Sequence, residues 1–207
     1  MPNWVFNKVH FYGNPEKIKE MRNFMETENN PFDFNKLIPM PEELNMTCGS
    51  DETIAIECAT ARRCGQSTCD EYEKFIYNQR KTFDEWADIG EKYLSNKEKY
   101  GHTTWYGWCC ANWGTKWNAC DAIWNGDDFV SFNTAWSVPL SIYEQLYKRF
   151  PEVSFEVEYA DEDLGSNCGC VSWNPEGSFY WKVMDDFDFA CEVWGYDPEE
   201  MREEMYE

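Results

Sequence analysis

The sequence predicts an α+β fold in which a split βαβ arrangement carries a helical insertion, followed by extra C-terminal strands and a helix. Strand-like and helix-like segments follow one another in the order strand, helix, insertion, two strands, helix, strand. At 207 residues the chain is long enough to bury its own core. Aromatic residues make up 18% of it, which supplies the apolar surface that folding needs.

Residues 1–46 are predicted to form the first strand, a helix and an edge segment. The strand is expected over residues 3–12, which are rich in aromatic and β-branched side chains. Asn14 and Pro15 mark the start of the helix, because Asn caps helices and Pro fits the first turn. Residues 32–41 alternate briefly and then contain two prolines, which suits a short edge segment followed by a rigid turn.

Residues 47–100 differ in composition, with mixed charge and several cysteines. Trp86, Ile89 and Tyr93 recur at helical spacing within this segment. We therefore expect a helical, cysteine-containing insertion here, with residues 101–184 forming the remainder of the main domain.

A hairpin is expected around Asn125 and Gly126, because an Asn-Gly step between two apolar runs favours a tight turn. Apolar residues then keep a helical period from Leu140 to Phe150, before Pro151 ends the segment.

Residues 153–159 alternate between apolar and polar side chains, which indicates a half-buried strand. Two more short strands are expected, over 169–173 and 178–183. Residues 185–207 form an acidic C-terminal tail, in which Asp197 and Pro198 predict a capped helix start.

Three motifs occur in order and carry a resemblance to a known family. They are the segment Asn112 to Ala119, the earlier segment from Phe32 to Leu44, and residues 134–137 with the sequence Thr-Ala-Trp-Ser. Together they resemble the YubB-type family, whose members are ferredoxin-like-domain proteins encoded mostly by phages and plasmids. The resemblance implies a ferredoxin-like fold and a mobile-element origin. It supplies no catalytic residues, and it does not extend to residues 47–70 or to the tail from 185 onward.

The net charge of the chain indicates which kinds of partner it can bind. The chain carries 39 acidic and 18 basic residues, a formal charge of −21. Such a charge disfavours direct binding to nucleic acid or to an anionic membrane surface, and it favours a basic protein. The N-terminus shows no secretory signal and no segment is long and apolar enough to span a membrane, so we expect a cytoplasmic protein of the host cell.

Carboxylates concentrate in the tail, where Glu200, Glu203, Glu204 and Glu207 recur along one stripe of the expected helix. We expect this acidic surface to occupy the basic groove of a host defence nuclease, as an anti-CRISPR or anti-restriction protein would, by imitating DNA. A solvated acidic face with no partner is the simpler interpretation. The predicted partner-binding residues are Asp185, Asp186, Asp188, Glu192, Glu199, Glu200, Glu203, Glu204 and Glu207.

The tryptophan-rich motif supports an alternative hypothesis, a module that binds a nucleotide-like small ligand. Its rings would stack on the ligand while a lysine pairs with charge. In a competing interpretation the tryptophans fill the interface between sheet and helix, and the lysine projects into water. The predicted ligand-binding residues are Trp113, Lys116, Trp117, Asn118 and Trp136.

Enzymatic chemistry is not expected. His10 and His102 are the only histidines, and no nucleophile-and-base or phosphate-loop motif surrounds them. The cysteines at 48, 58, 64 and 69 lack the close paired spacing of zinc ribbons, so we expect reduced thiols and no metal or other cofactor. A zinc-thiolate enzyme remains the third hypothesis.

Overall fold

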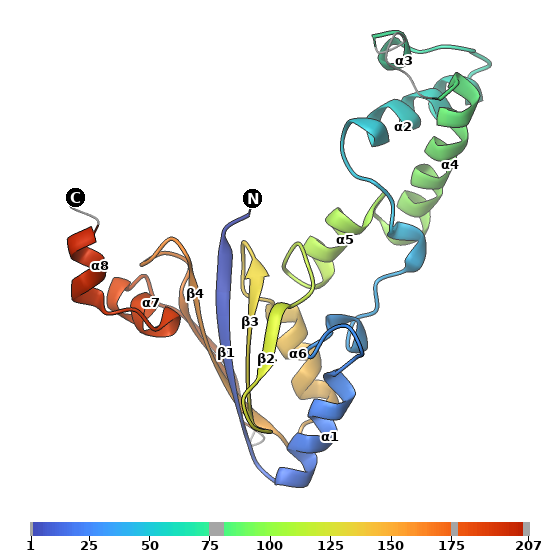
Figure 1. Cartoon of the computed structure of the whole chain (residues 1–207). Helices are drawn as coiled ribbons and strands as arrows, with labels where there is room; N and C mark the ends of the chain where they lie inside the picture. Colours follow the sequence, from blue (N-terminus) through green and yellow to red (C-terminus); the bar gives the residue numbers. More distant parts are fainter. Residues whose placement is uncertain (1, 75–80, 175–177, 205–207) are drawn as a thin grey trace. The chain divides into compact units, whose positions relative to one another are not determined.

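The computed structural model describes residues 2–74, 81–174 and 178–204 (Figure 1). The chain divides into two compact units. One comprises Met1–Pro39 and Cys110–Glu207, and the other comprises Met40–Cys109. The predicted insertion, 47–100, lies within the second unit.

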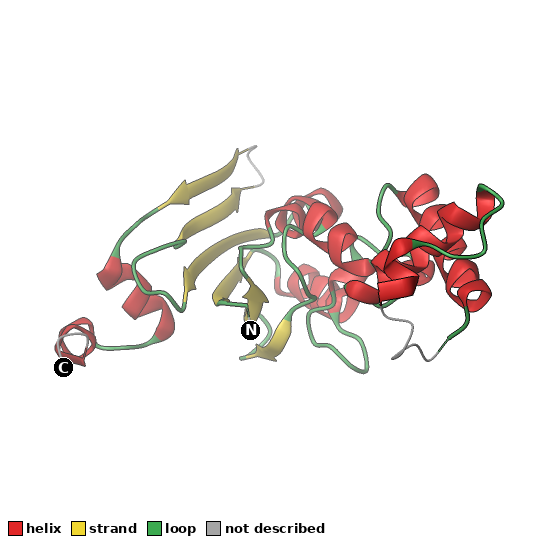
Figure 2. Ribbon diagram, turned by 90° about the horizontal axis from the view of Figure 1, so that it is seen from above, coloured by secondary structure: helices red, strands yellow, loops and turns green. Residues whose placement is uncertain are grey.

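The first unit is built on an antiparallel sheet, whose strands are yellow in Figure 2. The strand order is β2-β3-β1-β4-β5-β6. The order β2-β3-β1-β4, with one helix after β1 and another after β3, is the split βαβ arrangement, so the predicted fold class is confirmed. β5 and β6 extend the sheet beyond β4. The strands are β1 (Trp4–Tyr12), β2 (Cys120–Trp124), β3 (Phe129–Ala135), β4 (Ser154–Asp161), β5 (Gly169–Asn174) and β6 (Ser178–Val183).

Two helices, α1 (Pro15–Met25) and α6 (Leu140–Arg149), cover one face of this sheet (Figure 1). The side chain of Asn14 accepts a hydrogen bond from Glu16 N at 2.8 Å, which confirms the predicted helix start. The predicted hairpin is also present, since β2 and β3 pair and Gly126 adopts a φ of +77° between them. Glycine reaches that conformation without steric cost.

The other face of the sheet is covered by α7 (Phe187–Trp194) (Figure 1). Ala190 and Val193 are buried there, and the Phe6 ring of β1 stacks on the Trp194 ring with centroids 5.2 Å apart. The sequence predicted a helix only from Asp197 onward, where α8 (Pro198–Glu204) forms. The helix α7 was not expected, because its apolar residues lie among acidic ones that suggested a solvated tail.

The prediction of an edge segment at 32–41 is wrong, because Phe34–Lys36 forms a short 3-10 helix, η1. The Asp33 side chain accepts a hydrogen bond from Asn35 N at 2.9 Å and starts this turn. Phe32 and Phe34 are both buried, with ring centroids 5.0 and 5.9 Å from that of Phe132. The apparent alternation therefore reflects a turn that buries two aromatic rings.

The second unit is helical. Residues Ile54 and Ala55 of α2 pack with Trp86 and Ala87 of α4 in a separate core. Gly90 lies so close to α2 that a β-carbon added there would overlap the carbonyl oxygen of Ala55. The elements are η2 (Glu42–Leu44), α2 (Ser50–Arg63), α3 (Asp70–Lys74) and α4 (Phe83–Tyr100). The next helix, α5 (Trp105–Asn112), begins in this unit, and its residues after Cys109 belong to the first unit.

The two ends of the helical unit approach each other. The Sγ atom of Cys109 lies 3.7 Å from the Sδ atom of Met40, and these residues are the last and the first of the unit. The chain therefore enters and leaves residues 40–109 at neighbouring points. None of the helices in the described ranges has the length and apolar character that a bilayer-crossing segment requires.

Candidate functional site

The predicted partner-binding carboxylates gather on α7, α8 and the segment before α7. We call this set the α7–α8 acidic surface. All of its described side chains are exposed, and Glu207 lies outside the described residues. The described members are Asp185, Asp186, Asp188, Glu192, Glu199, Glu200, Glu203 and Glu204.

The helix α7 is fixed in orientation by its apolar side. Asp186 caps it, accepting a hydrogen bond from Phe189 N at 3.0 Å. Because Ala190 and Val193 face the sheet, Asp188 and Glu192, which are one turn apart, point outward. These carboxylates are therefore presented by a packed helix.

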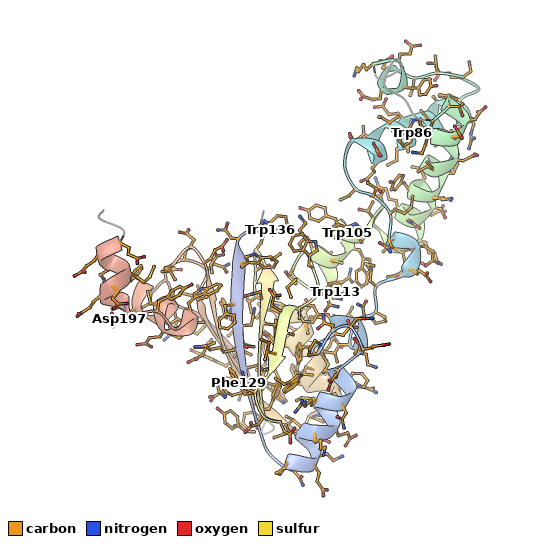
Figure 3. The ribbon with its side chains drawn as sticks, in the orientation of Figure 1. Trp86, Trp105, Trp113, Phe129, Trp136 and Asp197 are labelled. Atoms are coloured by element: carbon orange, nitrogen blue, oxygen red, sulfur yellow. The ribbon has the colours of Figure 1, made fainter. Side chains whose placement is uncertain are left out.

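The helix α8 has no buried residue. Its start is capped by Asp197, whose Oδ1 accepts hydrogen bonds from Glu199 N at 2.8 Å and Glu200 N at 3.3 Å, which confirms the predicted helix start (Figure 3). Arg202 is the only basic residue between 185 and 204. Its guanidinium forms a salt bridge with Asp188 and lies 5.1 Å from the centroid of the Phe187 ring.

Arg202 thus turns one side of α8 toward α7. Helical spacing places Glu199, Glu200, Glu203 and Glu204 on one broad side of α8, with Arg202 next to its edge. Four glutamates of α8 therefore form an exposed stripe.

The tryptophan-rich motif separates into buried and exposed parts. Trp113 is only 4% exposed, and its indole Nε1 donates a hydrogen bond to Ile38 O at 2.9 Å (Figure 3). Asn118 uses both ends of its amide: Oδ1 accepts from Phe34 N at 2.8 Å, and Nδ2 donates to Asp33 Oδ1 at 2.7 Å. These two predicted ligand-binding residues hold η1 against the sheet.

Lys116 lies between two indole rings. Its Nζ atom is 4.5 Å from the Trp117 ring centroid and 4.9 Å from the Trp136 ring centroid, which are cation–π distances. The Trp117 ring in turn contacts that of Trp4, with centroids 5.6 Å apart. The structure therefore brings together Lys116, Trp117 and Trp136 of the predicted set, and we call these three the Lys116 cluster.

Trp136 has an unusual backbone. Its φ is +72°, a left-handed conformation that costs an L-residue free energy, and its side chain is 43% exposed. Hydrogen bonds hold the peptide: Trp136 N donates to Asn3 O at 2.9 Å, and Asn167 Nδ2 donates to Trp136 O at 3.0 Å. The strained residue thus presents its indole beside the lysine.

The cysteines do not form a metal centre among the described residues. All ten lie in those residues as free thiols. No group of three or more histidine, cysteine or acidic side chains in the described part of the chain is placed to hold a metal ion.

The sequence did not indicate that aromatic residues stay exposed on β6. Tyr180 is 53% exposed and Trp181 is 49% exposed, although Trp181 Nε1 donates a hydrogen bond to Tyr159 Oη at 2.8 Å. The strand β6 lies at the edge of the sheet, and most of its residues are exposed.

The chain was compared with known proteins. A search of curated proteins gave no match. The crystal structure of protein api92 from Yersinia pseudotuberculosis is similar over 88% of this chain and 99% of that chain, with a TM-score of 0.42 and 9% sequence identity. Residues 112–207, slightly under half of the sequence, match a family described as the ferredoxin-like domain in Api92-like protein, and the chain accordingly carries a ferredoxin-like domain.

Proposed function

We propose that this chain is a non-enzymatic acidic protein of a mobile element, resembling the YubB-type family, which acts in the host cytoplasm. In this proposal it binds the basic nucleic-acid-binding surface of a host defence protein, as an anti-CRISPR or anti-restriction inhibitor, and blocks access to nucleic acid. The observation that carries the proposal is the exposed stripe of Glu199, Glu200, Glu203 and Glu204 on α8. The proposed partner is a nuclease or its complex, and neither direct nucleic-acid binding nor a membrane is involved.

Electrostatics supplies the driving force. Carboxylates three and four residues apart on a helix repel each other, and the one basic residue of α8, Arg202, is paired with Asp188. A partner that brings lysines or arginines to the stripe relieves this repulsion. The overall charge of −21 adds long-range attraction that speeds the encounter.

The local charge density is suited to a DNA-binding groove. The four glutamates of α8 lie within about one and a half helical turns, a length of roughly 7.5 Å. Duplex DNA carries about one charge per 1.7 Å, so both surfaces present several negative charges over a similar length. A groove that binds phosphates can therefore accept the stripe.

The test is a competition experiment with purified restriction and CRISPR nucleases. The full chain is added to each nuclease with labelled DNA, and displacement of the DNA is measured from low to high salt. We expect displacement from at least one nuclease, weakening as salt screens the charges. Failure to displace DNA from any of these nucleases would contradict the proposal, as would displacement that is independent of salt.

A matched pair of variants locates the surface. In the test variant, Glu199, Glu200, Glu203 and Glu204 are replaced by glutamine, which removes the stripe. The control replaces four exposed acids elsewhere and changes the net charge equally. Displacement should be lost only in the test variant, and equal loss in both would assign the effect to net charge alone. The control positions are Glu28, Asp84, Glu98 and Glu162.

A second candidate function is binding of an anionic, nucleotide-like ligand at the Lys116 cluster. The supporting observation is the position of Lys116 Nζ between the rings of Trp117 and the half-exposed Trp136. Indoles stack on flat bases, and an ammonium pairs with phosphate. Trp113 and Asn118 would act indirectly, because they position the segment on either side of the lysine.

A thermal-shift series with nucleoside mono-, di- and triphosphates tests this candidate. A ligand that binds the folded chain raises Tm by mass action. The shift should disappear in Lys116→Met and persist in Lys92→Met, which removes an exposed lysine of α4. No shift with any nucleotide, or an equal shift in both variants, would rule out this candidate.

A further inference from the structure

Two thiols of the helical unit are in contact. Cys58 lies on α2, and Cys69 directly precedes α3. Their Sγ atoms are 3.6 Å apart, so roughly 1.5 Å of approach would bring them to the length of a disulfide bond. Cys58 is fully buried, while Cys69 is partly exposed.

The partly exposed member of this pair opens into a cavity. Cys69 lines a pocket of about 490 Å³ together with the exposed Cys64. Three carboxylate residues, Glu57, Asp70 and Glu73, also line it, and the described lining contains no lysine or arginine. The cavity thus combines an accessible thiol with a negatively charged wall.

The two thiols differ in reactivity. Burial is the main reason why the pKa of Cys58 is raised, to about 12, and the contact with Cys69 adds to the effect. The thiolate is the nucleophile in disulfide exchange, so Cys58 is a poor first attacker. Cys69 is the member of the pair that a molecule in the cavity reaches.

We propose that Cys58 and Cys69 are a redox-active dithiol, oxidised to a disulfide by exchange with a low-molecular-weight disulfide that carries amino groups and enters through the cavity. The carboxylates of Glu57, Asp70 and Glu73 select the positive charge of this oxidant. This oxidation does not involve the α7–α8 acidic surface.

The exchange proceeds in two balanced steps. The Cys69 thiolate, after losing its proton to solvent, attacks one sulfur of the oxidant, forms a mixed disulfide and expels one thiolate. Cys58 then loses its proton and attacks Cys69 Sγ, forming the Cys58–Cys69 bond and expelling the second thiolate. Both expelled thiolates take up protons, so two protein thiols are oxidised while one disulfide is reduced to two thiols.

The experiment exposes the full-length chain to cystamine, a diamine disulfide, or to glutathione disulfide, which is anionic. Remaining thiols are then alkylated in denaturant and the peptides are analysed by mass spectrometry. We expect the tryptic peptide ending at Arg62 to become linked to the one ending at Lys74, through Cys58 and Cys69. The link should form at least about tenfold faster with cystamine, as expected for electrostatic focusing by a charged cleft. Equal rates with both reagents would refute the charge selection.

Single substitutions separate the roles of the thiols. In Cys69→Ser, Cys58 should stay a free thiol that is alkylated, whereas in Cys58→Ser, Cys69 should remain as a mixed disulfide. Cys64→Ser should form the link at the parent rate. Circular dichroism of each variant confirms that it is folded. Quantitative alkylation of Cys58 after oxidation of the parent chain would overturn the proposal, and so would a mixed disulfide on Cys69 that Cys58 never resolves.

Discussion

The hydroxyl of Tyr143 on α6 donates a hydrogen bond to Asn7 Oδ1 on β1 at 2.9 Å, and both residues are fully buried. Asn7 Nδ2 in turn donates to Thr134 Oγ1 on β3 at 3.0 Å. Polar groups in a core are costly unless they are paired, and this chain of bonds pairs them. It joins one helix and two strands of the ferredoxin-like unit.

Removing the Tyr143 hydroxyl should therefore destabilise the fold. Tyr143→Phe leaves Asn7 Oδ1 without its donor, and we expect the free energy of unfolding to fall by about 1–3 kcal/mol. Urea denaturation measures the change. Tyr12→Phe is the control, because Tyr12 is exposed, and it should change stability by less than about 0.5 kcal/mol. Equal effects of the two substitutions would contradict this role.

Alkaline pH should destabilise the helical unit through Tyr93. Burial, with smaller contributions from Glu52 and Asp51, raises the pKa of this tyrosine to about 12. Tyrosine in an unfolded chain ionises near pH 10, at about its reference pKa. Because the folded-state pKa is the higher one, the stabilisation is complete below the unfolded value and is lost as pH rises toward the folded value.

Denaturation of the parent chain and of Tyr93→Phe at a series of pH values tests this. The parent should lose stability more steeply above pH of about 10, since the Tyr93 phenol is absent from the variant while all other tyrosines are present in both chains. Tyr93→Phe also loses the hydrogen bond from Tyr93 Oη to Thr47 O, 2.6 Å long, so it should be less stable at neutral pH. Parallel pH curves for the two chains would exclude Tyr93 as the titrating group.

The close crossing of α2 and α4 depends on Gly90. Gly90→Ala places a methyl group on the carbonyl oxygen of Ala55, so the helices must separate. We expect the free energy of unfolding to fall by at least about 1 kcal/mol, although alanine favours the helix itself. Ser95→Ala, at an exposed position of α4, should be neutral or slightly stabilising. Thermal denaturation measures the stability of both variants. An increase in stability in Gly90→Ala would contradict the need for glycine where α2 and α4 cross.

The strain at Trp136 can be separated from its contact with Lys116. Trp136→Gly and Trp136→Ala both remove the indole, but only glycine adopts the φ of +72° without cost. The glycine variant should therefore be more stable than the alanine variant by about 1 kcal/mol, as measured by urea denaturation. A more stable alanine variant would show that the backbone relaxes away from this conformation.

The N-cap of α8 should determine the local stability of the helix that carries the glutamate stripe. Isolated helices as short as α8 are marginal in water, so its N-cap matters. Asp197→Ala removes the acceptor for Glu199 N and Glu200 N and should lower the local stability of α8 by about 1 kcal/mol. Amide hydrogen exchange should speed up in residues 199–204 and stay unchanged in β1. Glu162→Ala is the control, and unchanged exchange in α8 would refute the capping role.

Local signals predicted much of the fold. Asn14, the Asn125-Gly126 turn and Asp197 each act within a few residues of their own position, and each lies where expected. The βαβ order followed from the periodicity of the longer segments. The helix α7 was missed because its identity depends on Phe6, a residue far away in the sequence that packs against it.

The candidate sites could be predicted only in part. The acidic stripe of α8 follows from helical spacing, but the pairing of Arg202 with Asp188 requires two helices to meet. Trp113 and Trp136 look alike in the sequence, yet the fold buries one and exposes the other. The contact between Cys58 and Cys69 likewise depends on how the chain turns after α2.

Because Met40 and Cys109 lie in contact, we expect that the helical unit can be removed as one segment. A chain from which residues 40–109 are deleted would need only a short glycine-serine bridge, because closing a small gap costs little conformational entropy. The helical unit also has its own core, so we expect each of the two units to carry its own folding information. Exchange of this segment for another would leave the strand register of the remaining sheet unchanged.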